Sequence, residues 1–401
     1  MNLLGSFMFV AALGAAEPQV QGIGQDSTYG CIICHADKRR AFAQGVHAER
    51  GIRCHDCHGG DPTQYEVVPA HRGSFVGAPD KRATVSLCAS CHSDPNQMRQ
   101  YGLAADQLAE FRTSRHGQLL LEQGNSDAPT CTDCHEAHTI RRANDARSMV
   151  HPANIPETCG SCHEDSTLMA KYGIPAGQLD HYREGAHGKA LYEEANFASP
   201  TCIGCHGSHA ALPPTVSEIA QVCGHCHQLM ARAFYAGPHG DPSLAGSLPG
   251  CLACHTTHGT ERIPPDQVDE LCATCHDVDG RVPGLAGEIE EELLRARQDL
   301  AAATHAIEEM ETTGRSVADE RFRYLAAYTA YKQFGRVQHS LDLAQLEELG
   351  RQVRSNTGVI DATAEAYAEE RWEHKLLLIP VWFLALSALV LAMFKLRDLE
   401  Q

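Results

Sequence analysis

The chain has 401 residues, enough for two or three domains, and its formal net charge of −18 disfavours nucleic acid as a partner, because a phosphate backbone attracts basic surfaces. A soluble partner with a basic docking face suits such a chain better. Aromatic residues make up only 6%, so something other than large side chains must fill much of the interior, whereas the 18 cysteines and 24 histidines far exceed ordinary usage.

Residues 1–16 predict a secretory signal peptide. Leu3–Leu13 is a short apolar run, and the small residues Gly14-Ala15-Ala16 before Glu17 form a suitable cleavage site. No Lys or Arg precedes the run, which departs from the usual pattern. An uncleaved anchor is the alternative, but the run is too short to span a membrane comfortably. We therefore expect an exported protein.

The region 17–283 contains the motif Cys-x-x-Cys-His nine times and uses every cysteine of the chain. The cysteine pairs are Cys31 and Cys34, Cys54 and Cys57, Cys88 and Cys91, Cys131 and Cys134, Cys159 and Cys162, Cys202 and Cys205, Cys223 and Cys226, Cys251 and Cys254, and Cys272 and Cys275. The histidines that follow them are His35, His58, His92, His135, His163, His206, His227, His255 and His276.

This motif predicts nine covalently attached c-type haems. Two cysteines at this spacing form thioethers with the porphyrin edge, and the adjacent imidazole reaches under the ring to bind iron as the proximal ligand. Structural zinc and a disulfide framework are the alternatives, but neither requires a histidine after every cysteine pair. Haem attachment is therefore the chemistry that this region predicts.

Part of the haem region is an internal repeat, because residues 88–138 reappear at 159–209 with a constant offset of 71 and no gap. A shortened copy begins at Cys223, and a less regular copy begins at Cys31. The repeating unit is a pair of haem motifs with a histidine before the second motif. We expect short helices to carry the motifs and Gly- and Pro-containing loops to wrap haems, which replace large side chains as packing material.

Electron-transfer haems take a second strong iron ligand, and eight histidines recur in places that suit this distal role. Four of them precede the second motif of a repeat, and three follow a proximal histidine in the pattern CHxxH. In the first repeat, which lacks the CHxxH histidine, one further histidine takes the equivalent role. They are His47, His116, His187, His239, His138, His209, His258 and His71. A histidine in CHxxH is too close in sequence to reach over its own iron, so we expect it to bind the iron of a neighbouring haem.

The ninth distal ligand has two candidates. His339 lies at a predicted helix junction in Val337–Ser340, and His305 lies in a predicted helix but off its apolar stripe, so His339 is favoured. Other histidines are expected at the surface or in supporting positions, and those inside motifs are less favoured as ligands: His151, His181, His374, His55 and His225. Met98 and Met169 are expected to pack under haems, although a methionine ligand is the alternative.

Residues 284–374 contain no cysteine and have a helical pattern. The first predicted helix has an apolar stripe at alternating spacings of four and three, which is typical of helix pairing. The stripe consists of Ile289, Leu293, Ala296, Leu300, Ala303, Ile307 and Met310. Gly314 is expected to end this helix, and a second should cover 317–338. A third begins near Ser340 and runs toward the membrane segment, although Asn356-Thr357-Gly358 could break it.

A transmembrane helix is predicted over 375–395, because Leu376–Phe394 is an uncharged stretch of 19 residues, or roughly 28 Å of helix. Since c-type haem is attached outside the cytoplasmic membrane, the haem motifs should lie on the periplasmic side, with 396–401 as a cytoplasmic tail. The expected fold is mainly α with extensive loops: a haem-packed multihaem cytochrome c domain, a helical hairpin or bundle, and a single C-terminal membrane helix.

Residues 88–258 resemble the periplasmic multihaem cytochromes with doubled CxxCH motifs, through the string Tyr-Gly…Phe/Tyr…His-Gly…Pro-Thr-Cys-x-x-Cys-His-x-x-His. This resemblance implies an electron carrier or conduit that works with a quinol-oxidising membrane partner. Gln338-His339-Ser340 is similar to the helix junction of the pentahaem nitrite reductases and hydroxylamine oxidoreductases, where a histidine binds haem iron. The chain departs from the nitrite reductases because none of its motifs is CxxCK.

Two functions remain open. The first is an electron relay in which every iron is six-coordinate and no residue is catalytic. Its partners would be membrane lipid, a quinol-oxidising or quinone-reducing membrane complex, and a soluble or outer redox protein. The second is a multihaem oxidoreductase of a small nitrogen or sulfur oxyanion, which requires one open iron. Tyr324, Tyr328 and Tyr331 form the one aromatic cluster suited to a catalytic site, and helix packing is favoured for them. Because the chain supplies enough histidines for nine irons, the relay is preferred.

Overall fold

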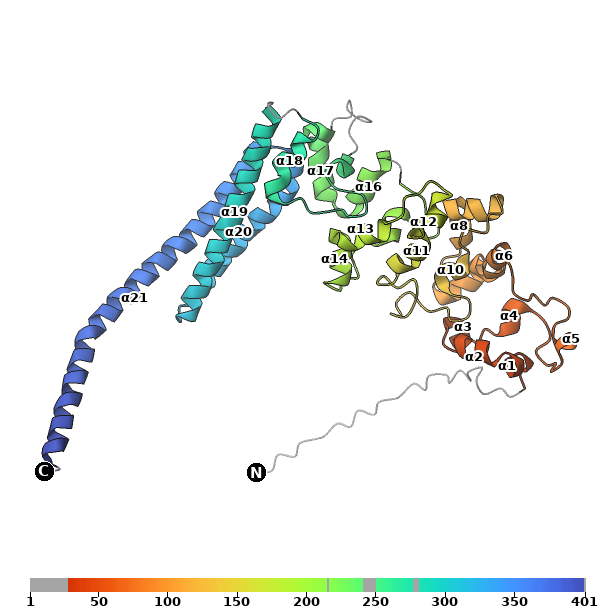
Figure 1. The fold of residues 1–401 in the computed structure, drawn as a ribbon, viewed down its shortest axis with the longest axis horizontal. Coiled ribbons are helices and arrows are strands. Elements are labelled where there is room, and N and C mark those ends of the chain that lie inside the picture. Colours follow the sequence, from red (N-terminus) through yellow and green to blue (C-terminus); the bar gives the residue numbers. More distant parts are fainter. Residues whose placement is uncertain (1–27, 215, 241–249, 277–280, 400–401) are drawn as a thin grey trace, which may run out of the picture. The chain divides into compact units, whose positions relative to one another are not determined.

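The computed structural model describes residues 28–214, 216–240, 250–276 and 281–399, and every regular element within these ranges is a helix (Figure 1). This confirms the expected mainly α fold with extensive loops. The predicted signal peptide, residues 1–16, lies outside the described residues.

The chain forms two compact units. Unit 1 comprises the chain up to Pro214 together with His258–Thr260, and unit 2 comprises Thr215–Thr257 and the chain from Glu261 onward. The boundary falls inside the region 17–283 that was expected to form one haem domain. The first six haem motifs therefore belong to unit 1, and the last three are grouped with the C-terminal helices in unit 2.

Unit 1 consists of short helices joined by loops. They are α1 (Gly30–Cys34), α2 (Ala36–Phe42), α3 (Val46–Glu49), α4 (Cys54–His58), α5 (Val67–Ala70), α6 (Lys81–His92), α7 (Pro95–Met98), η2 (Arg99–Tyr101), α8 (Gln107–Thr113), α9 (Arg115–Gly117), η3 (Gln118–Glu122), α10 (Cys131–His135), α11 (Ile155–His163), α12 (Ser166–Ala170), α13 (Gln178–Glu184), α14 (Ala186–Tyr192) and α15 (Cys202–His206). None of these helices exceeds the 12 residues of α6.

Two kinds of helix carry the second to sixth motifs of unit 1. The second, fourth and sixth motifs are each a helix of five residues, α4, α10 and α15. The third and fifth motifs form the last turn of longer helices, α6 and α11. In α4 and α10 an aspartate of the motif, Asp56 or Asp133, accepts a hydrogen bond from the backbone N–H before the first cysteine, which fixes the start of the helix.

The apolar core of unit 1 is divided into small clusters. One contains Tyr29, Ile32, Phe42 and Ala48 beside the first two motifs, and another contains Val85, Leu120 and Ala128 beside the third and fourth. Clusters of three or four buried side chains cannot by themselves stabilise a unit of this length. This is the arrangement expected if large cofactors supply most of the packing surface.

Unit 2 begins with short helices and ends in a bundle. The short helices are α16 (Val216–Cys226), α17 (Gln228–Ala236), η4 (Pro238–Gly240), η6 (Gly250–Ala253), η7 (Pro265–Gln267) and α18 (Val268–Ala273). The bundle consists of α19 (Arg281–Thr312), α20 (Ala318–Val337), the short turn η8 (Gln338–Ser340) and α21 (Leu343–Leu399) (Figure 1).

The apolar stripe predicted on the first bundle helix is confirmed, because all of its residues are buried in α19. Its first part, from Ile289 to Leu300, packs with Phe334 of α20 and with Leu346 of α21. The buried carboxylate of Glu292 lies 2.6 Å from the guanidinium of Arg354, so the polar group that enters this core is paired. Gly314 lies in the turn after α19 with φ +91°, as predicted for a helix end.

The predicted break at 356–358 is wrong, because α21 runs from Leu343 to Leu399 without interruption. The polar side chains there bond to the helix itself: Asn356 Nδ2 donates to the carbonyl of Gln352, and the buried Thr357 hydroxyl donates to that of Val353. Packing against α19 and α20 on this stretch outweighs the low helix propensity of the three residues.

Among the described residues, α21 is the helix that is long and apolar enough to cross a membrane. Its apolar end is not buried by the rest of the chain; Trp382, Phe383 and Leu384 are each at least two-thirds exposed. The bundle accompanies α21 as far as Tyr367, whose hydroxyl donates to the carbonyl of Thr313. The helix is therefore compatible with a single-pass anchor that begins beyond the bundle.

We expect a chain that ends at His374 to be soluble and fully loaded with haem, because this truncation removes the apolar segment and leaves every bundle contact in place. Fractionation of cells that express the truncated and full-length chains tests this, with haem stain to follow both. Retention of the truncated protein on membranes after a salt wash would show that another part of the chain is the anchor.

Candidate haem sites

Eight of the nine proximal histidines lie opposite one of the predicted distal histidines. The distances between the ring centres of the paired imidazoles are all 6.1 to 6.3 Å. The pairs are His35–His71, His58–His138, His92–His47, His135–His209, His163–His116, His206–His258, His255–His339 and His276–His239. Each pair lies within one unit.

The separation fits an iron between the rings. A metal–imidazole bond is about 2.0 Å and the ring centre lies about 1.1 Å behind the bonded nitrogen, so two axial imidazoles on one iron have ring centres about 6.2 Å apart. The pairs are too wide for direct contact between the rings and have the width required for a haem iron between two nitrogens. Bound haem would supply one-electron redox chemistry at each of these positions.

A first group of pairs follows a forward register. The histidine before an even-numbered motif pairs with the proximal histidine of the next odd-numbered motif. The members are His47–His92, His116–His163 and His239–His276. Each repeat thus supplies a ligand position for the motif that begins the following pair.

A second group follows a backward register. The histidine in CHxxH pairs with the proximal histidine of the even-numbered motif one repeat earlier. The members are His138–His58, His209–His135 and His258–His206, and their ring planes are within 18° to 23° of parallel. The two registers together link the copy at residues 88–138 to both of its neighbours in the sequence.

The two remaining pairs use the irregular candidates. His71 lies opposite His35 and stacks on Phe75, with 4.2 Å between ring centres. His339 of η8 lies opposite His255, with ring planes 21° apart. The alternative to His339 was His305, whose side chain is exposed on α19.

Several proximal histidines are oriented by backbone carbonyls. Nδ1 of His58 lies 3.0 Å from the carbonyl of Val76, Nδ1 of His206 lies 3.2 Å from that of Leu212, and Nδ1 of His255 lies 2.9 Å from that of Glu261. A carbonyl only accepts, so Nδ1 carries the proton and Nε2 keeps its lone pair for a metal. This is the usual supporting arrangement for a metal-binding histidine.

Burial lowers the pKa of several of the paired imidazoles. Burial, and next the neighbouring His163, lower the pKa of the His116 imidazole. Burial likewise lowers the pKa of His47 beside His92 and that of His339 beside His255. The neutral imidazole that results at neutral pH is the form that coordinates metal.

A tight turn, which the sequence interpretation did not explain, presents the forward-register histidines. A Cβ on Gly117 would collide with the carbonyl oxygen of Phe111, and a Cβ on Gly188 would collide with that of Tyr182. Only glycine therefore fits after the histidine in each repeat. The His-Gly pair at the 71-residue offset was the sequence signal for this turn.

A second turn directs the backward-register histidines away from their own motifs. The residue after the proximal histidine has a positive φ in the motifs that precede His138 and His209: +63° at Glu136 and +80° at Gly207. The chain reverses there, so the histidine of CHxxH points toward a different motif. This explains why His138 lies opposite His58 and not above His135.

The two cysteines of a motif differ in their exposure. The first cysteine is partly buried in every motif, but the second is exposed in all motifs except those of Cys57 and Cys134. The exposed second cysteines are Cys34, Cys91, Cys162, Cys205, Cys226, Cys254 and Cys275.

The exposed second cysteines lie at or just beyond the ends of their helices. Cys205 near the end of α15 and Cys275 after α18 are examples, and each lies three residues beyond the first cysteine of its motif. A thioether forms at the porphyrin edge, so the sulfur must be accessible and not enclosed in a side-chain core. Both residues stay predicted attachment points, held by the chain on one side only.

Sulfur contacts place the motifs in sequence order. Within each pair of motifs the first cysteines meet: a hydrogen bond from Cys88 lowers the pKa of Cys131 to about 7, and one from Cys223 lowers that of Cys251 to about 7. A hydrogen bond from Cys159 likewise lowers the pKa of Cys202.

Between one pair of motifs and the next, the second cysteines are neighbours. Burial, and next the charge of Cys91, raise the pKa of Cys57. Burial is also the main cause that raises the pKa of Cys134, with Cys162 among its neighbours. Successive motifs from Cys57 to Cys202 are thus adjacent to one another, which gives the order of the haem positions along the unit.

His187 and His227 are not among the eight pairs described above. His187 lies in unit 1, where its Nδ1 is 3.1 Å from the hydroxyl of Thr260, and His227 ends a motif in unit 2. Both make further contacts in the structure. His187 stands at the repeat position of His116, and it stays a predicted distal ligand.

Histidines expected outside the ligand set have other partners or are exposed. His55 Nδ1 lies 2.9 Å from the buried hydroxyl of Tyr29, and His151 Nδ1 accepts from the N–H of Ala153. Met98 and Met169 are buried, in keeping with a packing role. Among the described residues no group of His, Cys, Asp and Glu forms a separate metal cluster.

One comparison with known proteins bears on these sites. A family model described as the doubled CXXCH motif matches residues 245–281, which contain the last two motifs. No curated protein and no solved structure matches the chain. The match and the motifs support a multihaem c-type cytochrome with covalently bound haem, which is an electron-transfer class of protein. The similarity of the helix junction at His339 to nitrite reductases and hydroxylamine oxidoreductases stays a prediction.

Replacing His116 by Ala should convert one haem from low spin to high spin and leave covalent haem attachment unchanged, because the variant removes one axial ligand and no cysteine. The optical and electron paramagnetic resonance spectra of purified protein measure this. His181→Ala, which alters an exposed histidine in the following repeat, is the matched control and should keep the parent spectrum. An unchanged low-spin spectrum for His116→Ala would show that His116 is not a ligand.

A second pair of variants distinguishes the candidates for the ninth distal position. His339→Ala should produce one high-spin haem, whereas His305→Ala should not, because only His339 lies opposite a proximal histidine. The same spectra measure both variants. A high-spin signal from His305→Ala alone would reverse the assignment.

Proposed function

We propose that this chain is a periplasmic, membrane-anchored cytochrome with nine haems that relays electrons between a quinol-linked membrane partner and a periplasmic redox partner. The observation that carries the proposal is the set of eight histidine pairs at one common separation. An iron with an imidazole on each face has no open position for substrate. Such an iron exchanges electrons and does not bind a nitrogen or sulfur oxyanion.

The adjacency of successive motifs supports conduction. The rate of electron transfer falls steeply with distance, so a relay needs its cofactors in contact or nearly so. Cysteines of consecutive motifs are neighbours in unit 1, for example Cys88 and Cys131, then Cys134 and Cys162. Haems attached there would follow one another in sequence order and form a continuous path.

The anchor and the charge support the choice of partners. The apolar end of α21 holds the protein at membrane lipid, where quinol-oxidising or quinone-reducing complexes reside. The net charge of −18 suits a soluble or outer redox protein with a basic docking face. Attachment of c-type haem outside the cytoplasmic membrane supports a periplasmic location for both units.

The haem count is tested by intact mass. We expect the mass of the purified, mature chain to exceed that of the polypeptide without its signal peptide by nine haems, because the chain has nine complete motifs. A variant with both Cys272→Ala and Cys275→Ala should lose one haem and serves as the calibration. Eight or fewer haems on fully matured parent protein would contradict the count.

The choice between relay and enzyme is tested on the oxidised full-length protein. We expect a low-spin electron paramagnetic resonance spectrum that does not change when nitrite or hydroxylamine is added, since paired imidazoles leave no site for either. A stoichiometric high-spin signal that shifts with either ligand, together with turnover using a reduced dye, would establish the oxidoreductase instead.

A further inference from the structure

The haem motifs of unit 2 gather at one end of the bundle. His339 lies in the turn just before α21 begins at Leu343, and it faces His255. The last motif ends at His276, shortly before α19 begins at Arg281. The starts of α19 and α21 lie together, because Ile289 and Leu346 share one buried cluster.

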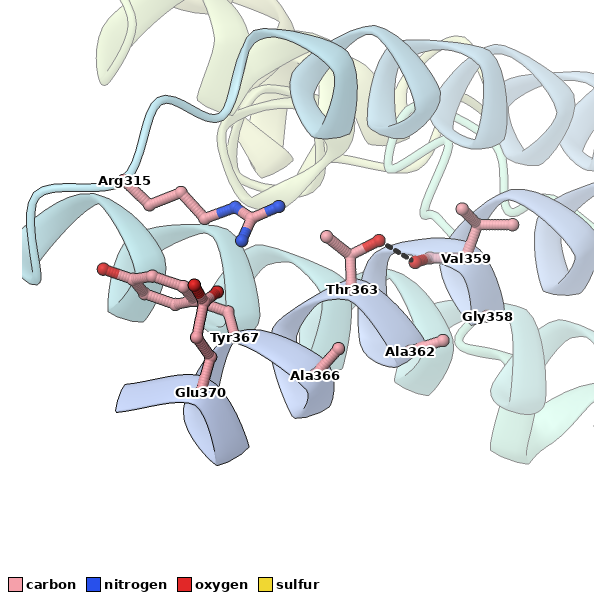
Figure 2. A pocket seen from close by; sticks show the side chains of 8 residues that line it. All are labelled: Arg315, Gly358, Val359, Ala362, Thr363, Ala366, Tyr367 and Glu370. Atoms are coloured by element: carbon pink, nitrogen blue, oxygen red, sulfur yellow. Dashed lines mark hydrogen bonds between the residues drawn. The ribbon is translucent and has the colours of Figure 1, made fainter. Parts of the chain in front are cut away.

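The opposite end of the bundle points along α21 toward the apolar segment. There the end of α19 packs on α21 through Met310 and Ile360. The guanidinium of Arg315, in the turn after α19, lies 4.9 Å from the ring centre of Tyr367 (Figure 2). The packing of α21 on this end of α19 extends to Tyr367, which lies nine positions before Leu376.

The length of α21 between its start and its apolar segment determines how far the haem end of the bundle can stand from the membrane. At about 1.5 Å per residue, the stretch from Leu343 to Leu376 spans about 50 Å. This exceeds the roughly 30 Å thickness of a bilayer's hydrocarbon core. The proline inside the helix, Pro380, lies beyond Leu376, so any kink there leaves this length unchanged.

Continuity of α21 opposes a bundle that lies flat on the membrane. Sharp bends in helices occur at proline, at glycine–serine pairs or at inserted groups, and residues 359–375 contain no proline, glycine or serine. The charged side chains there are mostly acidic, since only Arg371 and Lys375 are basic, whereas helices that lie in a membrane interface are rich in Lys and Arg.

Before its apolar segment, α21 exposes few large apolar side chains, chiefly Val359 and, four residues before Leu376, Trp372. A groove of about 520 Å³ lies between this stretch of α21 and Arg315, and its lining includes the small residues Gly358, Ala362 and Ala366 (Figure 2). These residues offer little apolar area to lipid. The most exposed large apolar side chains of α20 are Phe322 and Leu325.

We infer that the bundle is a stalk that holds the haems of unit 2 about 50 Å of helix away from the hydrocarbon boundary. The electron partner at this end is then a protein whose own redox centre stands outside the bilayer at that height, and not a quinol dissolved in the lipid. The inference rests on the proposed relay function and names the kind of partner that it requires.

The height is measured on the full-length haem protein in nanodiscs. Haem quenches a fluorophore on a lipid headgroup when the two are close, so we expect weak quenching. Deletion of residues 368–374, two helical turns, should bring the haems about 10 Å closer and increase quenching. Phe322→Asp with Leu325→Asp should leave quenching unchanged. If quenching is strong in the parent and weaker in this double variant, the bundle lies on its side against the membrane, and the inference is wrong.

The partner is tested with a quinol that is used in two forms, one with a long lipid tail and one without a tail. The quinol is chosen so that the form without a tail reduces the haems in solution. We expect the long-tailed form, confined to the nanodisc lipid, to leave the haems oxidised. Direct reduction by the lipid-dissolved form would contradict the stalk while leaving the relay intact. Failure of the relay itself would appear separately, as a substrate-sensitive high-spin haem in the full-length protein.

Discussion

The exchange of histidines between repeats is the constraint on which the haem region depends. A proximal histidine is fixed by its own motif, but the imidazole opposite it comes from a neighbouring repeat, as in His58 with His138. Neither repeat can therefore adopt its final geometry alone. The small side-chain clusters of unit 1 suffice because metal ligation and cofactor packing take over the work that a continuous apolar core performs in other proteins.

The same constraint joins the haem region of unit 2 to its helices. His339 is supplied by the junction of α20 and α21, so the bundle is held to the haem position at His255. The bundle is stabilised in the ordinary way, by Phe334 and Leu346 in a continuous apolar core and by the paired Glu292. His339 therefore joins the part of unit 2 that haem ligation stabilises to the part that an apolar core stabilises. The helix α21, which contains the apolar segment, begins four residues after it.

Much of this could be predicted from the sequence, because the chemistry resides in local motifs. The cysteines, the proximal histidines, the stripe on α19 and the candidate His339 all follow from spacing. The pairing could not be predicted, because it depends on two turns of the chain: the turn at Gly117 directs His116 toward His163, and the turn at Glu136 directs His138 toward His58. The break expected at 356–358 failed because local propensity was weighed without the packing that surrounds Thr357.

The backward register has a consequence for the order of assembly. If the chain is exported from its N-terminus, as the proposed location requires, the motif of His58 emerges well before His138, and that of His135 well before His209. An iron attached at such a motif would then keep one face open until a whole further repeat had emerged. In the forward register the order is the opposite, because the distal histidine precedes the motif: His47 would emerge before His92. Given the proposed location, a half-exported chain would carry irons with one open face at the even-numbered motifs, and completion of translocation would supply their second ligands.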